Sequence, residues 1–308
     1  MGSVRNCPRQ GALAPPPEAA QFRILGTLEV IDGLRSLDLH RPKPLALLAM
    51  LLLHPNHVVS SDRLVEALWG DGPPRSAANT LQSYVCLLRQ VLAQLRGGAA
   101  IRTHTTGYIL AVDTEQIDAQ RFERLVTEGR DAHALGDARH AAKVLGDALA
   151  LWRGPALADF AYEGFADAEA ARLEELRLAT VEQHAQAQLA LGRHLQLTSP
   201  LRALVADHPL REPLWALLML ALYRCGRQAE ALRAFQAAKA ALRDELGIDP
   251  CPALCRMEAD ILAQAPALEW PGHAAVPAHS ATVTPIHQAR LPAAVGRAGQ
   301  TMTSPGQG

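Results

Sequence analysis

Residues 79–95 read NTLQSYVCLLRQVLAQL, and residues 101–110, a short link later, read IRTHTTGYIL. In the first stretch apolar residues recur at helical spacing and form one stripe, which consists of Leu81, Val85, Leu88 and Leu92. The second stretch has the composition of two short strands. We therefore predict a long amphipathic helix followed by a β-hairpin.

The face of this helix opposite the apolar stripe is mostly short, polar and uncharged. It carries Asn79, Gln82, Ser83, Cys86, Arg89 and Gln90. Side chains of this kind read base edges in a DNA major groove, where Gln82 suits an adenine and Arg89 a guanine or a phosphate. The pattern alone fits a surface helix of any α-rich domain equally well, so the preceding residues decide between the two.

The residues before this helix predict a small sheet and two further helices. Hydrophobic residues alternate with polar ones from Phe22 to Val30 and again at Leu37 and Leu39, around a turn at Asp32-Gly33. The run LALLAMLLLHPN after Pro42 and Pro44 predicts a buried helix ending near His54-Pro55. A short helix follows, with Ser60 or Ser61 as N-cap and Gly70 as its end. Sheet, helix, helix, turn, long helix and hairpin is the order of a winged helix-turn-helix domain.

Several ordered motifs resemble the Streptomyces antibiotic regulatory protein family over roughly residues 21–265. They are FRILGTLEV, PKPLALLAMLLLHPNHVVSSDRLVEALWGD, NTLQSYVCLLRQVL, TTGYIL, LALWRGPALADF, FADAEAARLEELRLATVEQ, HPLREPLWALLMLALYRCGRQAEAL and LGIDP. The resemblance implies an OmpR-type DNA-binding domain joined to a bacterial transcriptional activation domain built of helical repeats. It also implies an activator of secondary-metabolite gene clusters that binds promoter direct repeats in double-stranded DNA as a homodimer and recruits RNA polymerase.

The expected DNA contacts divide into base contacts and phosphate contacts. Bases are expected to meet Asn79, Thr80, Gln82, Ser83 and Arg89, phosphates Lys43, Arg75 and Arg102, and the wing tip contributes His104, Thr105 and Thr106. Where the family usually has PKQRALLA, SRLRK and Arg-Pro-Pro, this chain has Pro44-Leu45, Cys86 to Gln90, and His104 to Thr106. Each missing phosphate contact lowers the salt-dependent part of the affinity. We therefore expect a single copy to bind DNA weakly.

Composition and repeats extend this organisation to the whole chain. Residues 21–112 carry nine Lys or Arg against six Asp or Glu, and residues 113–265 carry seventeen against twenty-three, so a mildly basic front precedes an acidic back. Gly136, Gly192 and Gly226 each separate two helical patterns, and the last two lie one tetratricopeptide period apart. The fold class is therefore mostly α with a small antiparallel β component. We expect a disordered tail at 1–20, the winged helix at 21–112, an all-α tetratricopeptide-like domain at 113–265 and a second disordered tail at 266–308.

Other classes of function find little support in the sequence. None of the three lysines follows a glycine, so the phosphate-binding GxxxxGK[ST] loop is absent, and neither GxSxG nor HExxH occurs. Because these motifs are absent, we predict no enzyme activity and no cofactor. We also predict no metal site, because the five cysteines are scattered along the sequence. Without a membrane span or signal peptide, the sequence predicts a cytoplasmic, nucleoid-associated protein with no membrane partner. The alternative is a helical-repeat interaction adaptor whose winged helix no longer binds DNA.

Overall fold

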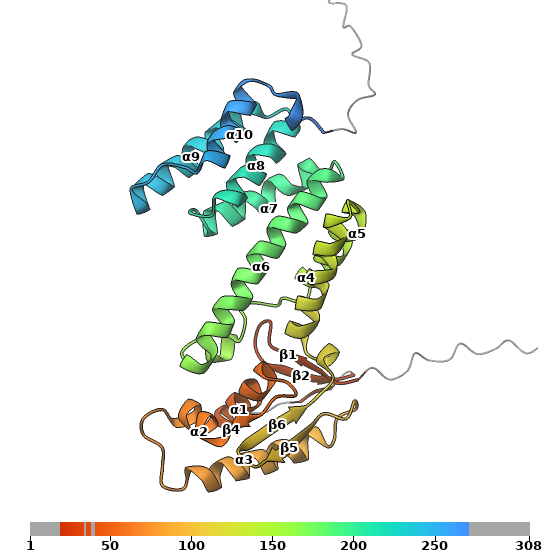
Figure 1. The fold of residues 1–308 in the computed structure, drawn as a ribbon, viewed down its shortest axis with the longest axis vertical. Coiled ribbons are helices and arrows are strands. Elements are labelled where there is room, and N and C mark those ends of the chain that lie inside the picture. Colours follow the sequence, from red (N-terminus) through yellow and green to blue (C-terminus); the bar gives the residue numbers. More distant parts are fainter. Residues whose placement is uncertain (1–18, 34, 38–40, 271–308) are drawn as a thin grey trace, which may run out of the picture. The chain divides into compact units, whose positions relative to one another are not determined.

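The fold is that of a computed structural model, which describes residues 19–33, 35–37 and 41–270 (Figure 1). Two small antiparallel sheets and three helices come first, and a series of paired helices follows. The predicted fold class is confirmed. The expected tail residues 1–18 and 271–308, and Leu39 of the expected sheet, lie outside the described residues.

The first sheet has the order β1-β2-β3 and is antiparallel throughout. Its strands are β1 (Gln21–Arg23), β2 (Glu29–Asp32) and β3 (Arg35–Leu37), with Phe22 opposite Val30 in the register. The predicted turn after Asp32 is confirmed, since Gly33 has φ +64°, a conformation that glycine adopts without steric cost. Ala20, which we expected in the disordered tail, is buried and donates its N–H to the carbonyl of Arg96 at 2.9 Å.

The helices of the front part follow the predicted order. They are α1 (Pro42–Leu53), α2 (Ser61–Trp69) and α3 (Ala77–Leu92). Ser60 is the N-cap of α2, because its hydroxyl accepts the N–H of Arg63 at 3.2 Å, and Gly70 ends that helix at φ +61°. A second sheet of order β4-β6-β5, formed by β4 (Val59–Ser60), β6 (Gly107–Ala111) and β5 (Ala100–His104), contains the predicted hairpin.

The rest of the described chain is built of helix pairs. After the 3-10 turn η1 (Thr114–Gln116), the pairs are α4 (Asp118–Ala134) with α5 (Ala138–Leu149), α6 (Gly164–Ala190) with α7 (His194–Asp207), and α8 (Glu212–Arg224) with α9 (Gln228–Leu246). Gly136, Gly192 and Gly226 join the members of each pair at φ between +73° and +78°, as the repeat pattern predicts. A Cβ on Gly129 of α4 would lie 2.5 Å from Leu145 of α5, so glycine allows this pair to pack closely.

The helical part ends later than the sequence indicates. Beyond α10 (Pro252–Leu262), residues Pro266–Leu268 form the turn η3, and Leu268 is buried. Trp270 Nε1 donates to the carbonyl of Ala190 at 2.9 Å, and its ring would obstruct any Cβ on Gly192. The expectation that disorder begins at 266 is therefore wrong for residues 266–270. Their hydrophobic side chains lack helical periodicity because they cover the end of a helix pair.

The winged helix and the first helix pair share one hydrophobic core. Phe22 of β1 forms a parallel bridge with Ile117, and both side chains are fully buried. The segment after α5, which includes the turn η2 (Ala158–Phe160), continues the contact, because the N–H of Leu157 donates to the carbonyl of Ile24 at 2.9 Å. Residue 112 is thus the end of a strand pattern, and the hydrophobic core extends past it to Leu173 of α6.

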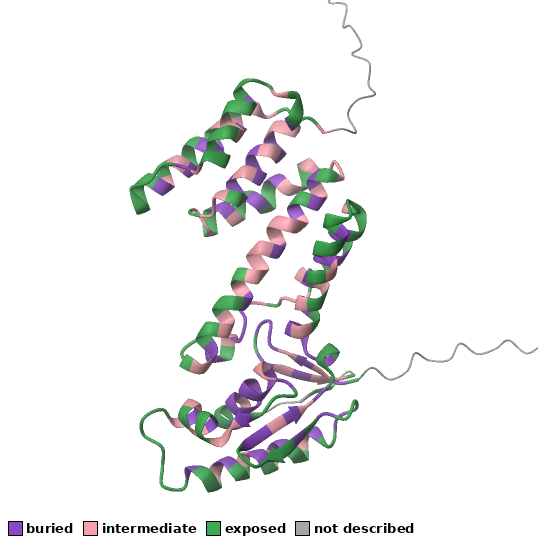
Figure 2. Cartoon of the chain, in the orientation of Figure 1, coloured by how far each residue is buried: buried purple, intermediate pink, exposed green. Residues whose placement is uncertain are grey.

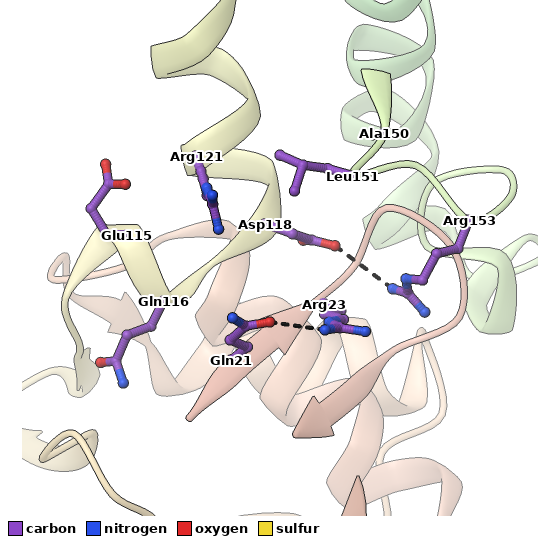
Figure 3. A pocket seen from close by; sticks show the side chains of 9 residues that line it. All are labelled: Gln21, Arg23, Glu115, Gln116, Asp118, Arg121, Ala150, Leu151 and Arg153. Carbon is purple, nitrogen blue, oxygen red and sulfur yellow. Dashed lines mark hydrogen bonds and ion pairs between the residues drawn. The ribbon is translucent and has the colours of Figure 1, made fainter. Parts of the chain in front are cut away.

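A buried carboxylate, that of Asp118, joins the helical part to the first sheet by hydrogen bonds. Asp118, at the first position of α4, accepts the N–H groups of Ile24 and Leu25 at 2.8 and 3.0 Å. Arg153 Nη2 lies 3.7 Å from the same carboxylate (Figure 3). Arg153 Nη1 forms an ion pair with Glu29 at 2.9 Å. Burial raises the pKa of Asp118, and the two backbone N–H groups and Arg153 oppose that rise.

Candidate nucleic-acid interface

The helix α3 has one buried and one exposed side, as predicted (Figure 2). The four leucine and valine positions of the apolar stripe are buried, and Asn79, Gln82, Ser83, Cys86, Arg89 and Gln90 are all exposed. Thr80 is half-buried. The hydroxyl of Ser83 donates to the carbonyl of Asn79 at 3.0 Å, so Ser83 is already bonded within the helix. Asn79 and Gln82 are left as the exposed amides of the first two turns.

The hairpin β5–β6 is held against the start of α2. The N–H of Ser61 donates to the carbonyl of Thr106 at 2.9 Å, and Gly107 pairs with Ser60 in the sheet. A Cβ on Gly107 would lie 2.0 Å from the carbonyl oxygen of Val59, so only glycine allows this approach. The side of the hairpin that meets the helices is fixed, and its tip is exposed.

The expected wing residues are all exposed. Arg102 lies on β5, and His104, Thr105 and Thr106 form the tip of the hairpin. The backbone N–H of Thr106 donates to Nδ1 of His104 at 3.5 Å, and the Thr106 hydroxyl lies 3.2 Å from the same nitrogen. The tip therefore has internal bonds that hold its shape and one exposed cation on the adjoining strand.

Arg89 lies between the helix and the wing. Its Nε donates to the carbonyl of Ile101 at 2.9 Å, and its Nη2 donates to the hydroxyl of Thr103 at 2.7 Å. The sequence assigns Arg89 to the groove-facing side of the helix. In the structure two of its donors bind β5 instead, and this contact depends on a strand that helical periodicity alone could not place.

Lys43 is also engaged within the protein. Its Nζ donates to the carbonyl of Leu68 in the last turn of α2 and lies 5.6 Å from the centre of the Trp69 ring. Trp69 in turn stacks on Tyr84 of α3, with ring centres 6.2 Å apart and planes 14° apart. A cation at the carboxyl end of a helix is favourable there. The sequence gives Lys43 a phosphate contact, whereas the structure places it at the end of α2.

Two further cations border this surface. Arg75, expected as a phosphate contact, is exposed in the segment that joins α2 to α3. Arg63, which sequence reasoning did not single out, is exposed in the first turn of α2, where the helix bonds to the wing tip. The position of Arg63 in the first turn of α2 could have been predicted from the N-cap, because its backbone N–H donates to the hydroxyl of Ser60.

Comparisons with known proteins agree with this architecture. Residues 37–110 match the family model of the transcriptional regulatory protein C-terminal domain, and residues 117–262 match that of the bacterial transcriptional activator domain. The chain is 37% identical to the regulatory protein DnrI of Streptomyces peucetius over 82% of this chain and 95% of DnrI. The transcriptional regulator RedD of Streptomyces coelicolor is also 37% identical, over 82% of this chain and 73% of RedD. This chain belongs to the Streptomyces antibiotic regulatory protein family.

A solved structure supports the same assignment. Mycobacterium tuberculosis EmbR, in complex with a low affinity phosphopeptide, superposes with a TM-score of 0.77 at 36% identity, over 80% of this chain and 66% of that chain. Some relatives are much longer, since the chain spans about a quarter of the regulatory protein AfsR of Streptomyces griseus, at 36% identity.

Membership of the Streptomyces antibiotic regulatory protein family gives each half of the molecule a general role. The front half is a DNA-binding domain of a transcriptional activator, and the helix pairs form the activator domain. Among the described helices, none combines the length and the apolar character that crossing a bilayer requires.

Proposed function

We propose that this chain activates a secondary-metabolite gene cluster by binding direct repeats in its promoters as a homodimer and recruiting RNA polymerase. The observation that carries the proposal is the exposed polar face of α3 beside the exposed wing tip, on a fold that continues into an activator domain. No catalytic step and no cofactor enter the proposal.

In this proposal α3 lies in the major groove. Gln82 and Asn79 are the base-reading side chains, because their amides are exposed and the Gln82 side chain makes no hydrogen bond to any other described residue. Thr80, Ser83 and the wing residues His104, Thr105 and Thr106 border the same surface. Arg75 and Arg102 contact phosphates on either side of the groove, and Arg63 adds a third positive charge.

The modest number of free cations on the described surface supports the pairing of two copies. Lys43 and Arg89, two of the expected contacts, already donate to carbonyl groups of the protein. Each phosphate contact contributes about 0.9 to the slope of log affinity against log salt, so a surface with few contacts binds weakly. Two copies on adjacent repeats multiply the affinity by about 10²–10⁴ without new contacts.

The test begins with DNA fragments selected from a random library by the full chain. We expect the selected sites to contain two copies of one motif in the same orientation, spaced by about 10–11 base pairs or a multiple. Gln82→Ala should relax the preference at one base pair, whereas Arg102→Ala should weaken binding to all sequences alike. Arg139→Ala, which changes an exposed arginine on α5, is the matched control.

The adaptor hypothesis predicts a different result. A chain that had lost specific DNA binding would select no motif. Its residual affinity for DNA at low salt would be the same in wild type and in the Gln82 and Arg102 variants. Capture of a protein partner by the full chain under those conditions would replace the proposed function with the adaptor function.

A further inference from the structure

A pocket of about 350 Å³ lies where the winged helix meets the helical domain (Figure 3). Its walls come from four elements: β1, η1, α4 and the segment that follows α5. The charged residues of its lining are Arg23, Glu115, Asp118, Arg121 and Arg153. None of them belongs to α3 or to the wing, so the pocket is separate from the candidate DNA interface.

Both carboxylates that line the pocket already have hydrogen-bond or ion-pair partners, although Arg124 also pairs with Glu128 at 3.3 Å. Glu115 accepts two hydrogen bonds from Arg124, at 2.6 and 3.0 Å. Asp118 accepts two backbone N–H groups and lies 3.7 Å from Arg153. Arg153 is itself occupied, because it pairs with Glu29 at 2.9 Å and donates to the carbonyl of Thr27 at 3.1 Å.

Two arginines of the pocket have no ion-pair partner among the described residues. Arg23 Nη2 donates at 2.9 Å to the side-chain oxygen of Gln21, which is uncharged. Neither Arg23 nor Arg121 forms an ion pair with any carboxylate in the part of the chain that the structure describes. The pocket thus holds two guanidinium groups that form no ion pair with a described carboxylate.

The two arginines approach the pocket from different domains. Arg23 belongs to β1 of the winged helix, and its side chain is half-buried. Arg121 is one turn into α4, and in Figure 3 its side chain points from that helix towards β1. A guanidinium group presents several N–H donors in one plane, which suits phosphate oxygens, and a tetrahedral phosphate can accept from two sides at once. The volume lies at the lower end of the range for small-molecule sites.

We propose that this pocket binds a small metabolite bearing a phosphate group, with Arg23 and Arg121 holding the phosphate from opposite domains. Such a ligand would bridge the winged helix and the helical domain. A ligand that binds the folded chain but not the unfolded chain stabilises the fold, and this stabilisation grows with the logarithm of ligand concentration once the ligand exceeds its dissociation constant. The ligand would therefore strengthen the junction at which Asp118 and Arg153 already join the two domains.

The experiment uses the full chain and inorganic pyrophosphate as the probe, at constant ionic strength. Binding is measured by titration calorimetry, and thermal unfolding is followed with and without the probe. We expect saturable binding to one site and a higher unfolding midpoint. Arg121→Gln should weaken binding at least ten-fold and leave the midpoint without probe unchanged, because Arg121 is exposed and makes no ion pair within the described residues.

Controls separate this pocket from the candidate DNA interface, which would also attract an anion. Arg102→Gln removes a cation of that interface and should leave pyrophosphate binding unchanged, as should Arg139→Gln on α5. Arg23→Gln should weaken binding as Arg121→Gln does, and Arg121→Glu should abolish it. Equal binding by wild type and Arg121→Glu, loss of binding in Arg102→Gln, or no saturable binding at all would overturn the proposal.

Discussion

The Nε of Arg89 in α3 donates a hydrogen bond to the carbonyl of Ile101 in β5, 2.9 Å away. The same guanidinium also reaches the hydroxyl of Thr103. This relationship joins the helix expected in the major groove to the strand that carries the wing. Arg89 is therefore placed to fix the angle between the two DNA-contacting elements.

Arg89→Ala should weaken binding to specific and unrelated DNA by similar factors. Without the guanidinium the wing loses two hydrogen bonds to α3, so its position becomes less defined, at a cost of about 1–3 kcal/mol in binding. Binding to a selected site and to unrelated DNA measures the two factors. Hydrogen exchange at β5 should also become faster in this variant.

A base-reading role for Arg89 would give the opposite pattern. In that case Arg89→Ala would lower the affinity for the selected site alone, and the exchange of β5 would stay as in wild type. Thr103→Val is the matched variant, because it removes one of the two bonds to Arg89 and leaves every positive charge in place.

Lys43→Met should destabilise the protein as well as alter DNA binding. The variant loses a charged donor to the last turn of α2 and a cation over Trp69, each with a typical contribution of about 0.5–1 kcal/mol. Urea denaturation should thus give a lower free energy of unfolding by about 1 kcal/mol. Lys143→Met, at an exposed position of α5, controls for the loss of charge, and an unchanged stability of Lys43→Met would leave Lys43 with a DNA role alone.

Periodicity and capping predicted most of the front half of the fold. An N-cap at Ser60 or Ser61, Gly70 as helix end and the buried stripe of α3 were all predicted, because local spacing determines each of them, and the structure selects Ser60. The partners of Arg89 and Lys43 were not readable in this way. Their acceptors are backbone carbonyls of Ile101 and Leu68, and a carbonyl carries no sequence signature.

The junction between the two halves illustrates the same limit over a longer distance. Phe22 and Ile24 fit a strand pattern, but the pattern does not tell which element covers the strand. In the structure the cover comes from Ile117 and Leu157, which lie about 95 and 133 positions later in the chain. The lining of the pocket, from Gln21 to Arg153, depends on the same distant contact and was not predicted.

Helical phasing on DNA tests the proposed pairing of two copies. Inserting about half a helical turn, roughly five base pairs, between the repeats places the two sites on opposite faces of the DNA. Activation of a reporter should then be lost, while binding to each single repeat is kept. Restoration by an insertion of one full turn is the control, and activation that ignores both insertions would indicate independent monomers.

Asp118 predicts a particular pH dependence of stability. Its folded-state pKa is raised above 3.8, mainly by burial, so the folded protein binds this proton more tightly than the unfolded chain. The stabilising contribution is therefore fully present below pH 3.8 and is lost as the pH rises through the raised pKa. Asp118→Asn removes the titration. The stability difference, wild type minus Asp118→Asn, should decrease in urea denaturation as the pH is raised from 3.8 through the raised pKa. An increase over this range would mean that Arg153 and the two N–H groups outweigh burial.

The shared core predicts where the chain can be divided. A fragment of residues 19–112 keeps every strand and helix of the winged helix but removes the cover of Phe22, Ile24 and Leu25. Exposing a fully buried side chain of this size costs about 1.5–3 kcal/mol, and three of them approach the whole stability of a typical domain. We therefore expect this fragment to unfold without cooperativity or to aggregate. This differs from the independent domain that the sequence pattern indicates.

A fragment of residues 19–190 retains α4, α5 and α6, including Leu173 at the far side of the core, and should unfold cooperatively. Calorimetry of both fragments measures the difference. If residues 19–112 alone show a cooperative transition near that of the longer fragment, the helical domain is not needed to hold the winged helix together.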